Sequence, residues 1–296
     1  MKRKLITPKL ATEVLDFTIH LFNSGIHGQK SFIFNESMRY FENDNFDSIN
    51  SPLVSALTEA EDLTGYLLYS NDPPKAINYG KYIAHSKGIL FWNNKYIWWV
   101  IHSVPNWPET LKPLSKMENS MSLYGQSMIV IKLSIFSKES ILSQLITQKV
   151  GVYASFNCKF AKRKLILSNV SSIEIGTSIP NTEIRHFSKS DLWSKDIFDD
   201  LICSSLNICL KVQSWGRPIM KDTLLSSNIK KIRWENGEQY KSSQDHSKWA
   251  VSSNINNPWI FISDLNRMKS QFNRGGGILA IKNEQIWRIF NSIIIE

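Results

Sequence analysis

Cysteine is scarce in this chain, and several features that would define a membrane or disulfide-rich class are missing with it. Three cysteines stand among 296 residues, so at most one internal disulfide can form and a disulfide framework is excluded. No stretch approaches about eighteen uninterrupted apolar residues, so we expect no transmembrane helix. No segment has low complexity, and a hydrophobic content of 42% is typical of a folded globular protein.

Acidic residues are outnumbered by basic ones, 26 to 35, which gives a formal net charge of +9. A field of basic side chains attracts polyanions, so nucleic acid is the natural candidate partner, although many basic proteins bind none. The basic start at residues 1–4 is similar to that of a secretory signal. Residues 5–15 contain Thr, Pro, Lys and Glu and cannot form its apolar segment, so we expect no export signal in the chain as written.

Histidine is also rare, and two of the six histidines stand in the same tripeptide, His85-Ser86-Lys87 and His246-Ser247-Lys248. The downstream residues match without a gap: each histidine is followed after eight positions by an asparagine and after thirteen by a tryptophan, namely Asn93 and Asn254, and Trp98 and Trp259. Chance is a poor explanation for two matched copies, so we interpret them as the two halves of one active site. The two tryptophans are expected to be core anchors.

Local patterns predict a mixture of strands and helices. Alternating β-branched and aromatic residues predict strands, and apolar residues at helical spacing predict helices. The expected strands cover residues 14–22, 89–92, 96–101, 127–134, 164–167 and 278–281. The expected helices cover residues 51–68, 137–149, 190–210 and 284–290. Residues 93–95 are expected to turn between two strands of a hairpin, and a second hairpin is expected after His246.

These elements favour a mixed α/β (or α+β) sandwich. We expect one domain over residues 1–296, made of an N-terminal half, 1–150, and a C-terminal half, 151–296. The first His-Ser-Lys stands at the front of its hairpin. On an extended segment a histidine and a lysine two residues apart project to the same side, so both can face one ligand.

The chemistry of this pair suits a phosphodiester. A neutral imidazole can attack phosphorus and a charged one can donate a proton, while lysine is a compact charge for a phosphate oxygen. Two such halves facing each other would supply a nucleophile and a general acid across one phosphodiester. The lysines would stabilise the charge on the equatorial oxygens of the transition state, and this scheme requires no metal ion and no cofactor.

This arrangement resembles that of the phospholipase D superfamily, and the flanking residues narrow the resemblance to the deoxyribonuclease II family. The likeness covers nearly the whole chain, and its matching segments follow the family's order. They are residues 68–74, 84–88, 101–108, 124–126, 245–251, 264–267 and 274–277. The resemblance implies a phospholipase D-like pseudodimer, in which two related halves, each with a central mixed β-sheet flanked by helices, form a composite active site at their interface.

The resemblance also implies an activity: an endonuclease that hydrolyses double-stranded DNA without a divalent metal, favours acid pH, and leaves 3′-phosphate ends through a phosphohistidine intermediate. The residues matching its catalytic motifs are His85, Lys87, His102, His246 and Lys248. The residues matching positions that support the histidines or the phosphate are Asn106, Gln126, Asp264 and Asn266. Sequence does not decide which of His85 and His246 attacks. Because one must be neutral and the other protonated, activity should fall well above neutral pH.

Other interpretations of single motifs remain open. Taken alone, each His-Ser-Lys fits a surface turn, and His102 fits a histidine at a strand end. The three glycines at 275–277 fit a phosphate-approaching loop or a flexible turn equally well, and the basic run at 159–164 fits a solvated face or a contact with DNA. Two functional alternatives also stand: a catalytically degenerate DNA-binding paralogue, and lipid phosphodiester cleavage by the same paired motif.

The family implies a lysosomal or secreted protein with a cleaved signal and disulfides, and this chain has neither in full. Either it begins near the family's mature amino terminus, or it is a divergent copy retained inside cells. No membrane partner is expected. Ala84 and Ser263 stand where the family tends to have glycine.

Overall fold

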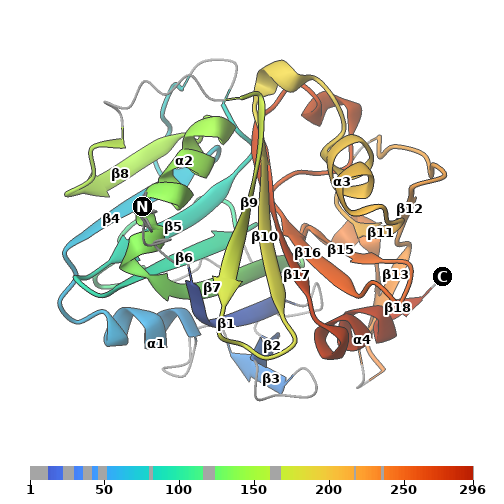
Figure 1. Cartoon of the computed structure of the whole chain (residues 1–296), viewed down its shortest axis with the longest axis horizontal. Coiled ribbons are helices and arrows are strands. Elements are labelled where there is room, and N and C mark those ends of the chain that lie inside the picture. The colour runs from blue at the N-terminus through green and yellow to red at the C-terminus, as the bar shows by residue number, and fades with distance from the viewer. Residues whose placement is uncertain are drawn as a thin grey trace, which may run out of the picture.

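One mixed β-sheet of fifteen strands runs through the whole molecule (Figure 1). The structure is a computed structural model, and it describes residues 13–22, 30–35, 42–45, 52–79, 83–115, 124–160, 168–216, 218–234 and 237–295. The strands of this sheet up to residue 160 are β1 (Glu13–Phe22), β2 (Lys30–Asn35), β3 (Glu42–Asn45), β4 (Gly65–Ser70), β5 (Lys87–Trp92), β6 (Tyr96–His102), β7 (Gln126–Ser134) and β8 (Val152–Phe156). The later strands are β9 (Val170–Thr177), β10 (Glu183–Lys189), β11 (Leu210–Gln213), β12 (Ser226–Asn228), β15 (Trp249–Ser252), β16 (Trp259–Ser263) and β17 (Gly276–Lys282).

Followed inward from either edge of the sheet, the strands around the two hairpins stand in matching order, β4-β5-β6-β7 in one series and β11-β15-β16-β17 in the other. From one edge the order is β8-β4-β5-β6-β7-β1, and from the other it is β12-β11-β15-β16-β17-β10-β9. The two series meet where β1 pairs in parallel with β9, through Glu13 opposite Gly176. Figure 1 shows β9 and β10 at the centre, with the earlier strands on one side and the later ones on the other. Each His-Ser-Lys therefore enters an equivalent strand, β5 or β15.

Helices and a second small sheet cover the strands. The helices are α1 (Pro52–Glu59), α2 (Lys138–Gln148), a π-helical segment (Ile197–Cys203) that continues into α3 (Ser204–Leu206), and α4 (Glu284–Ser292). The small sheet has the order β14 (Gln239–Lys241), β13 (Lys231–Arg233), β18 (Ile294–Ile295). None of the described helices is both long and apolar enough to cross a membrane. Cys203 and Cys209 are free thiols.

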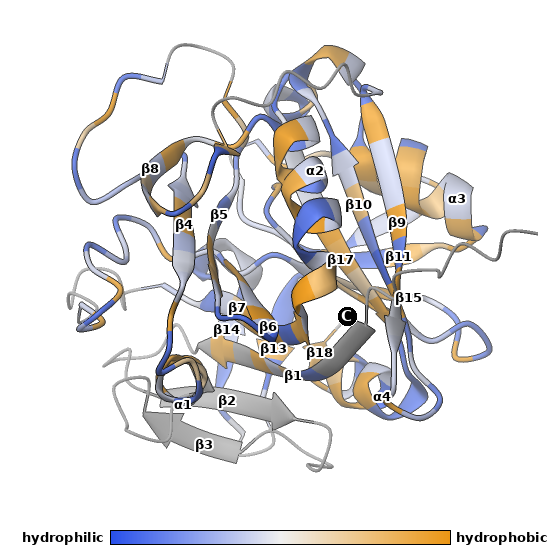
Figure 2. Cartoon of the chain, turned by 60° about the vertical axis from the view of Figure 1, so that its left-hand side comes forward, coloured by the Kyte–Doolittle hydropathy of each residue, from blue (hydrophilic) through white to orange (hydrophobic). Residues whose placement is uncertain are grey.

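The strands divide the core by their two-residue period. In β6, Trp99 and its neighbours at alternate positions face a central cluster that α2 and α4 join, while Trp98 faces a separate cluster with α1. In β16, Ile260 faces the same central cluster, and Trp259 faces a third cluster with Ile197–Cys203. Hydrophobic and hydrophilic stretches alternate along α2 in Figure 2. Trp98 and Trp259 are 1% and 2% exposed, which confirms them as core anchors.

Most of the expected elements are confirmed. The mixed α/β class is observed, as are the strands at 14–22 and 127–134, the helices at 137–149 and 284–290, and the strand at 278–281. Both hairpins are present as β5–β6 and β15–β16. The Asn93 side chain organises the first turn, because its Oδ1 accepts hydrogen bonds from the N–H groups of Lys95 (2.9 Å) and Tyr96 (2.8 Å). The expected strand at 164–167 lies outside the described residues, and the division at residue 150 stays a prediction.

Two expected helices were wrong in their extent. The helix expected over 51–68 ends at Glu59, and residues from Gly65 form β4 instead. The leucines there also fit a strand, since Leu67 and Leu68 face opposite sides of the sheet in different clusters, and Gly65 allows the Trp92 ring to lie against the backbone. The helix expected over 190–210 is helical only at 191–193 and 197–206, and Leu210 already belongs to β11.

Candidate active site

The first His-Ser-Lys is held by residues from the far end of the chain. Lys87 begins β5, and His85 lies just before it. The backbone N–H of His85 donates to the carbonyl oxygen of Gly275 at 2.9 Å. The ring Nδ1 of His85 lies 2.8 Å from the carbonyl oxygen of Asp264. Asp264 follows β16 and Gly275 precedes β17, so the C-terminal strands position the N-terminal histidine.

The second His-Ser-Lys is held reciprocally. The N–H of His246 donates to the carbonyl oxygen of Gly125 at 2.8 Å, and Gly125 stands directly before β7. The ring contacts differ, because the His246 ring stacks on Tyr124 with 4.3 Å between centroids and 3° between planes. Trp215 lies against the same ring at 4.9 Å and 58°. Each histidine is thus tied to a glycine that precedes the equivalent strand of the other series.

The two lysines are buried cations without a salt bridge. Lys87 and Lys248 are 7% and 5% exposed. Lys87 Nζ donates to Asn71 Oδ1, and Lys248 Nζ donates to the carbonyl oxygen of His246, both at 2.9 Å. Neither forms an ion pair within the described part of the chain. Burial lowers the pKa of Lys87 to about 8, and burial followed by repulsion from Lys87 lowers the pKa of Lys248 to about 7.

The histidines are affected by lysines from both motifs. Burial, and then the charges of Lys87 and Lys248, hold the pKa of His85 well below its usual range. Burial, and then the charges of Lys248 and Lys87, lower the pKa of His246 to about 4. Since each histidine responds to the lysine of the other motif, the four side chains share one electrostatic environment. His102 responds to both lysines as well, so the structure brings all five predicted catalytic residues into one electrostatic environment.

Asp264 contributes a backbone acceptor and a buried carboxyl. Burial raises the pKa of this carboxyl to about 7, against the opposing effects of a hydrogen bond from Ser86 and the charges of Lys248 and Lys87. At acid pH the carboxyl is therefore largely protonated and neutral. Burial also raises the pKa of Asp245, the other carboxyl that acts on Lys248, to about 6, while Lys87 also responds to the charge of Asp72. Lys248 therefore loses the charge of both its acidic neighbours at acid pH, which favours the binding of an anion from outside.

Gln126 acts through serines. Its Oε1 accepts a hydrogen bond from Ser103 Oγ at 2.5 Å, and Ser103 Oγ accepts one from the N–H of Ser127 at 2.9 Å. Ser127 Oγ in turn accepts from the N–H of Lys248 at 3.2 Å. Gln126 thus begins a chain of hydrogen bonds that ends at the backbone of the second motif.

The three other predicted residues lie around this centre. The N–H of Asn106, at a φ of 51°, donates to the carbonyl oxygen of Asp72 at 2.9 Å, which braces the turn that carries Asn71. His102 ends β6, is 3% exposed, and packs edge-on against Trp107 at 5.3 Å. Burial lowers the pKa of His102 to about 3, so the ring is neutral. Asn266 is 6% exposed. Their functional roles stay predictions.

The glycines at 275–277 are packed closely against other parts of the chain. A Cβ on Gly275 would lie 1.8 Å from the carbonyl oxygen of Gln148, and one on Gly277 would lie 2.5 Å from the Gln148 amide nitrogen. Gln148 Oε1 also accepts a hydrogen bond from Ser86 Oγ at 3.0 Å. The absence of side chains here lets the end of α2, the first motif and the start of β17 converge.

Sequence reasoning gave no role to several residues of this centre. Asn71, Gln148 and Trp215 contact the paired motifs from positions 16 to 62 residues away in the chain. Tyr124 belonged to a matched segment but received no role of its own. The repeat contains a signal for Trp215: in the register of the strand pairs it stands opposite Ser247 of the second motif, as Asn71 stands opposite Ser86 of the first.

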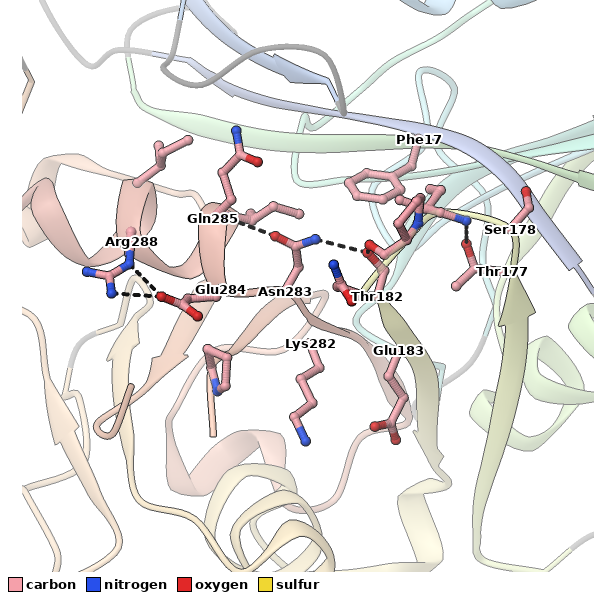
Figure 3. Close-up of a pocket in the computed structure, with 16 residues that line it drawn as sticks. Phe17, Thr177, Ser178, Thr182, Glu183, Lys282, Asn283, Glu284, Gln285 and Arg288 are labelled. Carbon is pink, nitrogen blue, oxygen red and sulfur yellow. Dashed lines mark hydrogen bonds and ion pairs between the residues drawn. The ribbon is translucent and has the colours of Figure 1, made fainter. Parts of the chain in front are cut away.

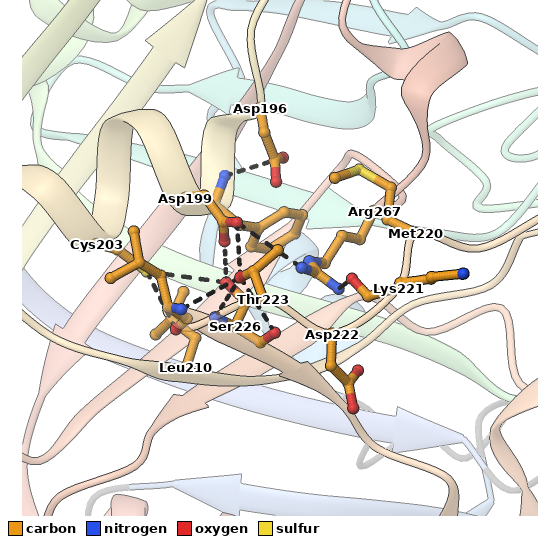
Figure 4. A network of polar contacts seen from close by, with 12 residues as sticks. Asp196, Asp199, Cys203, Leu210, Met220, Lys221, Asp222, Thr223, Ser226 and Arg267 are labelled. Carbon is orange, nitrogen blue, oxygen red and sulfur yellow. Dashed lines mark hydrogen bonds and ion pairs between the residues drawn. The ribbon is translucent and has the colours of Figure 1, made fainter.

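Arg267 anchors the loop that supplies the acceptor for His85 (Figure 4). Its side chain is fully buried, and Nη1 donates to the carbonyl oxygen of Lys221 and to Asn228 Oδ1, both at 3.1 Å. Its Nη2 lies 3.8 Å from Asp199 Oδ2, and its N–H donates to Ser214 Oγ at 3.0 Å. Arg267 therefore ties the 264–267 loop to the segment that carries Trp215.

A large pocket lies elsewhere. It has a volume of about 1380 Å³ and lies between Phe17, the β9–β10 turn and the start of α4 (Figure 3). Its lining includes Lys282, the last residue of β17, and Glu183, the first residue of β10. Gly276 and Lys189 lie at the opposite ends of these two strands. None of the residues of the paired motifs lines it, so its size does not make it the active site.

Comparison with known proteins shows the family of the chain. The family model for deoxyribonuclease II matches residues 29–296. The chain is 33% identical to mouse deoxyribonuclease-2-beta over 256 residues, which are 79% of this chain and 71% of the mouse protein. It is 31% identical to human deoxyribonuclease-2-beta over 264 residues, which are 82% of this chain and 73% of the human one. Cell-death-related nuclease 7 of Caenorhabditis elegans is 30% identical over 253 residues, 78% of this chain and 68% of the worm protein.

These matches place the chain among the nucleases, a class of hydrolases. Within that class, the chain belongs to the deoxyribonuclease II family. Within the described residues, no group of three or more His, Cys, Asp or Glu side chains could hold a metal ion.

Proposed function

We propose that this protein is a metal-independent acid endodeoxyribonuclease, which hydrolyses DNA phosphodiesters to 3′-phosphate ends through a phosphohistidine intermediate. The observation that carries the proposal is the pair of buried lysines, Lys87 and Lys248, which have no salt bridge among the described residues and are each followed by a strand of an equivalent hairpin. Burying two like charges is costly without an anion, and a phosphodiester between them supplies one. His85 and His246 then stand beside the same phosphate.

His85 is suited to the attack. The carbonyl oxygen of Asp264 can only accept a hydrogen bond, so the proton of neutral His85 lies on Nδ1 and the lone pair lies on Nε2. The lowered pKa keeps this ring neutral. Nε2 attacks the phosphorus, forms the N–P bond, and the bond from phosphorus to the 5′-oxygen breaks.

His246 is suited to proton transfer. The Tyr124 ring lies face to face with its ring and Trp215 lies tilted against it by 58°. The face of an aromatic ring stabilises an imidazolium, which opposes the lowering of the His246 pKa by burial. Charged His246 gives its proton to the departing 5′-oxygen and then, neutral, takes a proton from the water that attacks the phosphohistidine. The second step breaks the N–P bond, releases a 3′-phosphate and restores His85. Lys87 and Lys248 stabilise the oxygens that carry the negative charge in both steps.

The test is plasmid cleavage at about pH 5 in EDTA by the wild-type protein and by the variants His85→Ala and His246→Ala. We expect the wild type to cut and to leave 3′-phosphate ends. We expect His246→Ala to be about 10²- to 10⁴-fold slower, the usual range for a lost general acid, and His85→Ala to be at least as slow. Thermal unfolding of each variant controls for folding.

Each other outcome of this assay has a meaning. Cleavage that EDTA abolishes would contradict metal independence. Either histidine variant at the wild-type rate would contradict the composite site. A mobility shift of the plasmid without product would instead identify a DNA-binding paralogue that does not cut.

We also propose a lysosomal or secreted location. The support is chemical: a site whose lysine, Lys248, has a pKa of about 7 and whose proton donor, His246, has a pKa of about 4 is most fully protonated in an acidic compartment. Fluorescence microscopy of the tagged protein in its own cells, against an acidic-compartment dye, tests this. Retention in the cytosol would contradict it.

A further inference from the structure

The paired motifs have different neighbours at equivalent positions. Gly125 and Gly275 accept the N–H groups of His246 and His85, so Tyr124 and Arg274, which directly precede these glycines, stand at equivalent positions. Tyr124 stacks on His246, whereas Arg274 Nε lies 3.4 Å from the carbonyl oxygen of Ile83, two residues before His85. One motif is therefore flanked by an aromatic ring and the other by a cation.

A second pair of equivalent positions has the same asymmetry. In β4, Ser70 pairs with Lys87 of β5, and in β11, Gln213 pairs with Trp249 of β15. One residue beyond the pairing of β11, Ser214 stands opposite Lys248 as Ser70 stands opposite Lys87, so the next residues, Trp215 and Asn71, are equivalent. Asn71 hydrogen-bonds Lys87, and Trp215 lies against the ring of His246. Polar groups thus surround the His85 motif, and two aromatic rings surround His246.

The two rings are accessible as well as close. Tyr124 is 44% exposed although one of its faces lies on His246, and Trp215 is half-buried. Exposed aromatic rings beside a nucleic-acid site are platforms on which bases stack, and stacking tolerates any base because every base has a π-face. A base can rest on such a platform only when it leaves the stack of its own duplex.

The side of the scissile phosphate follows from the role of His246. This histidine protonates the departing 5′-oxygen, so the nucleoside that carries that oxygen lies on the His246 side. We propose that Tyr124 and Trp215 form a nucleobase subsite for the nucleotide on the 3′ side of the scissile phosphate, which accepts that base in an unstacked state. The inference rests on the proposed function, since it takes the proton donor from that mechanism.

The test separates base binding from mere support of His246. The substrates are short single-stranded oligothymidylates with one phosphodiester among uncleavable methylphosphonate linkages, made with an abasic residue on the 3′ side or on the 5′ side of that phosphodiester. In the wild type, the 3′ abasic residue should lower kcat/KM by about fivefold to one hundredfold, the usual worth of one stacked base. The 5′ abasic residue should have a much smaller effect.

The variants decide where the base rests. In Tyr124→Ala and Trp215→Ala the penalty for the 3′ abasic residue should shrink towards onefold, while Tyr124→Phe and Trp215→Phe should keep most of it. Phe136→Ala and Trp193→Ala are matched controls, because Phe136 is also exposed and Trp193 is also half-buried, and neither contacts the paired motifs. These controls should keep the full penalty.

A full 3′ penalty in both alanine variants, or no penalty in the wild type, would overturn the subsite. If the alanine variants cut all substrates more slowly by the same factor, the rings only position His246. This result would also overturn the proposed subsite. The same oligonucleotides are measured in parallel by fluorescence anisotropy. If no substrate is cut but binding loses its base dependence in Tyr124→Ala, the subsite stands and the nuclease proposal fails. If binding shows no base dependence either, both fail.

Discussion

His85 and His246 have the same sequence neighbours but different ring contacts. The Nδ1 of His85 is held by a backbone carbonyl, which fixes the tautomer that leaves Nε2 free. His246 meets aromatic faces instead. The tripeptide supplies a histidine and a lysine at a fixed spacing, and the residues brought in by the fold decide what each histidine does.

The pH dependence of kcat/KM belongs to these residues. His246 must be protonated to act, and its pKa of about 4 means that the active form declines as pH rises through that value. Lys248 is charged below its pKa of about 7 and loses its charge as pH rises further. His85 must be neutral, so activity also falls at the lowest pH, below its own lowered pKa.

We therefore expect kcat/KM for DNA to peak in the acid range, to fall about tenfold per pH unit above the peak, and to fall more steeply above about pH 7, where the second group discharges. Initial rates measured at constant ionic strength from about pH 3 to pH 9 test this. A rate that stays constant to about pH 8 would contradict the assignment of proton donor and lysine.

At the scale of elements, the site depends on the junction of α2, β5 and β17. Gly275 lies against the last turn of α2, and its carbonyl oxygen holds the N–H of His85 at 2.9 Å. The contact is between two backbones, so no side-chain movement can make room for a Cβ. The hydrogen bond that positions His85 and the packing of α2 therefore both depend on Gly275.

Replacing Gly275 with alanine should weaken both the packing of α2 and the hydrogen bond that positions His85. The new Cβ would lie 1.8 Å from the carbonyl oxygen of Gln148, so the chain must move away and carry the acceptor of His85 with it. We expect a loss of about 1–3 kcal/mol in the free energy of unfolding, as for other overpacked sites, and a fall in kcat of about 10²-fold from the displaced histidine. Urea unfolding and DNA cleavage rates measure the two effects.

Gly237→Ala is the control. Its φ of 86° is strained for alanine, but no atom lies within 4 Å of the added Cβ, and the residue stands in the turn before β14. It should lose about 1 kcal/mol of stability and keep its activity. Wild-type activity in Gly275→Ala would show that the convergence of these elements does not position His85.

The elements that sequence predicted well are those with local patterns. The two hairpins follow from alternating residues and an asparagine turn, and α4 follows from its apolar spacing behind Asn283, whose side chain accepts from the N–H of Ile286. The end of α1 was missed because Leu63 and Leu67 satisfy both periods, and only the pairing of β4 with β5 decides between them. Such pairing is not a local property.

At the scale of the whole molecule, the site unites residues that are far apart in the chain. The contact between His85 and Asp264 spans 179 residues. The sequence identified both as candidate site residues but did not predict that they contact each other. The internal repeat did predict that the two motifs belong together, because equivalent halves place equivalent residues at one centre. It could not predict the contacts of Asn71 and Trp215, since these equivalent positions hold different residues in the two halves.

The central claim is that two halves supply one nucleophile and one proton donor to the same phosphate. The most direct test uses the His246→Gln variant in EDTA with labelled DNA whose scissile 5′-oxygen is replaced by sulfur, a leaving group that needs no proton. The reaction is quenched with alkaline denaturant, and the labelled peptide is identified by mass spectrometry. We predict one equivalent of a 3′-phosphoryl adduct on His85. The adduct should persist because this variant lacks His246, which activates the water that hydrolyses it. The His85→Gln variant should form no adduct. An adduct on another residue, or steady turnover without an adduct, would contradict the account.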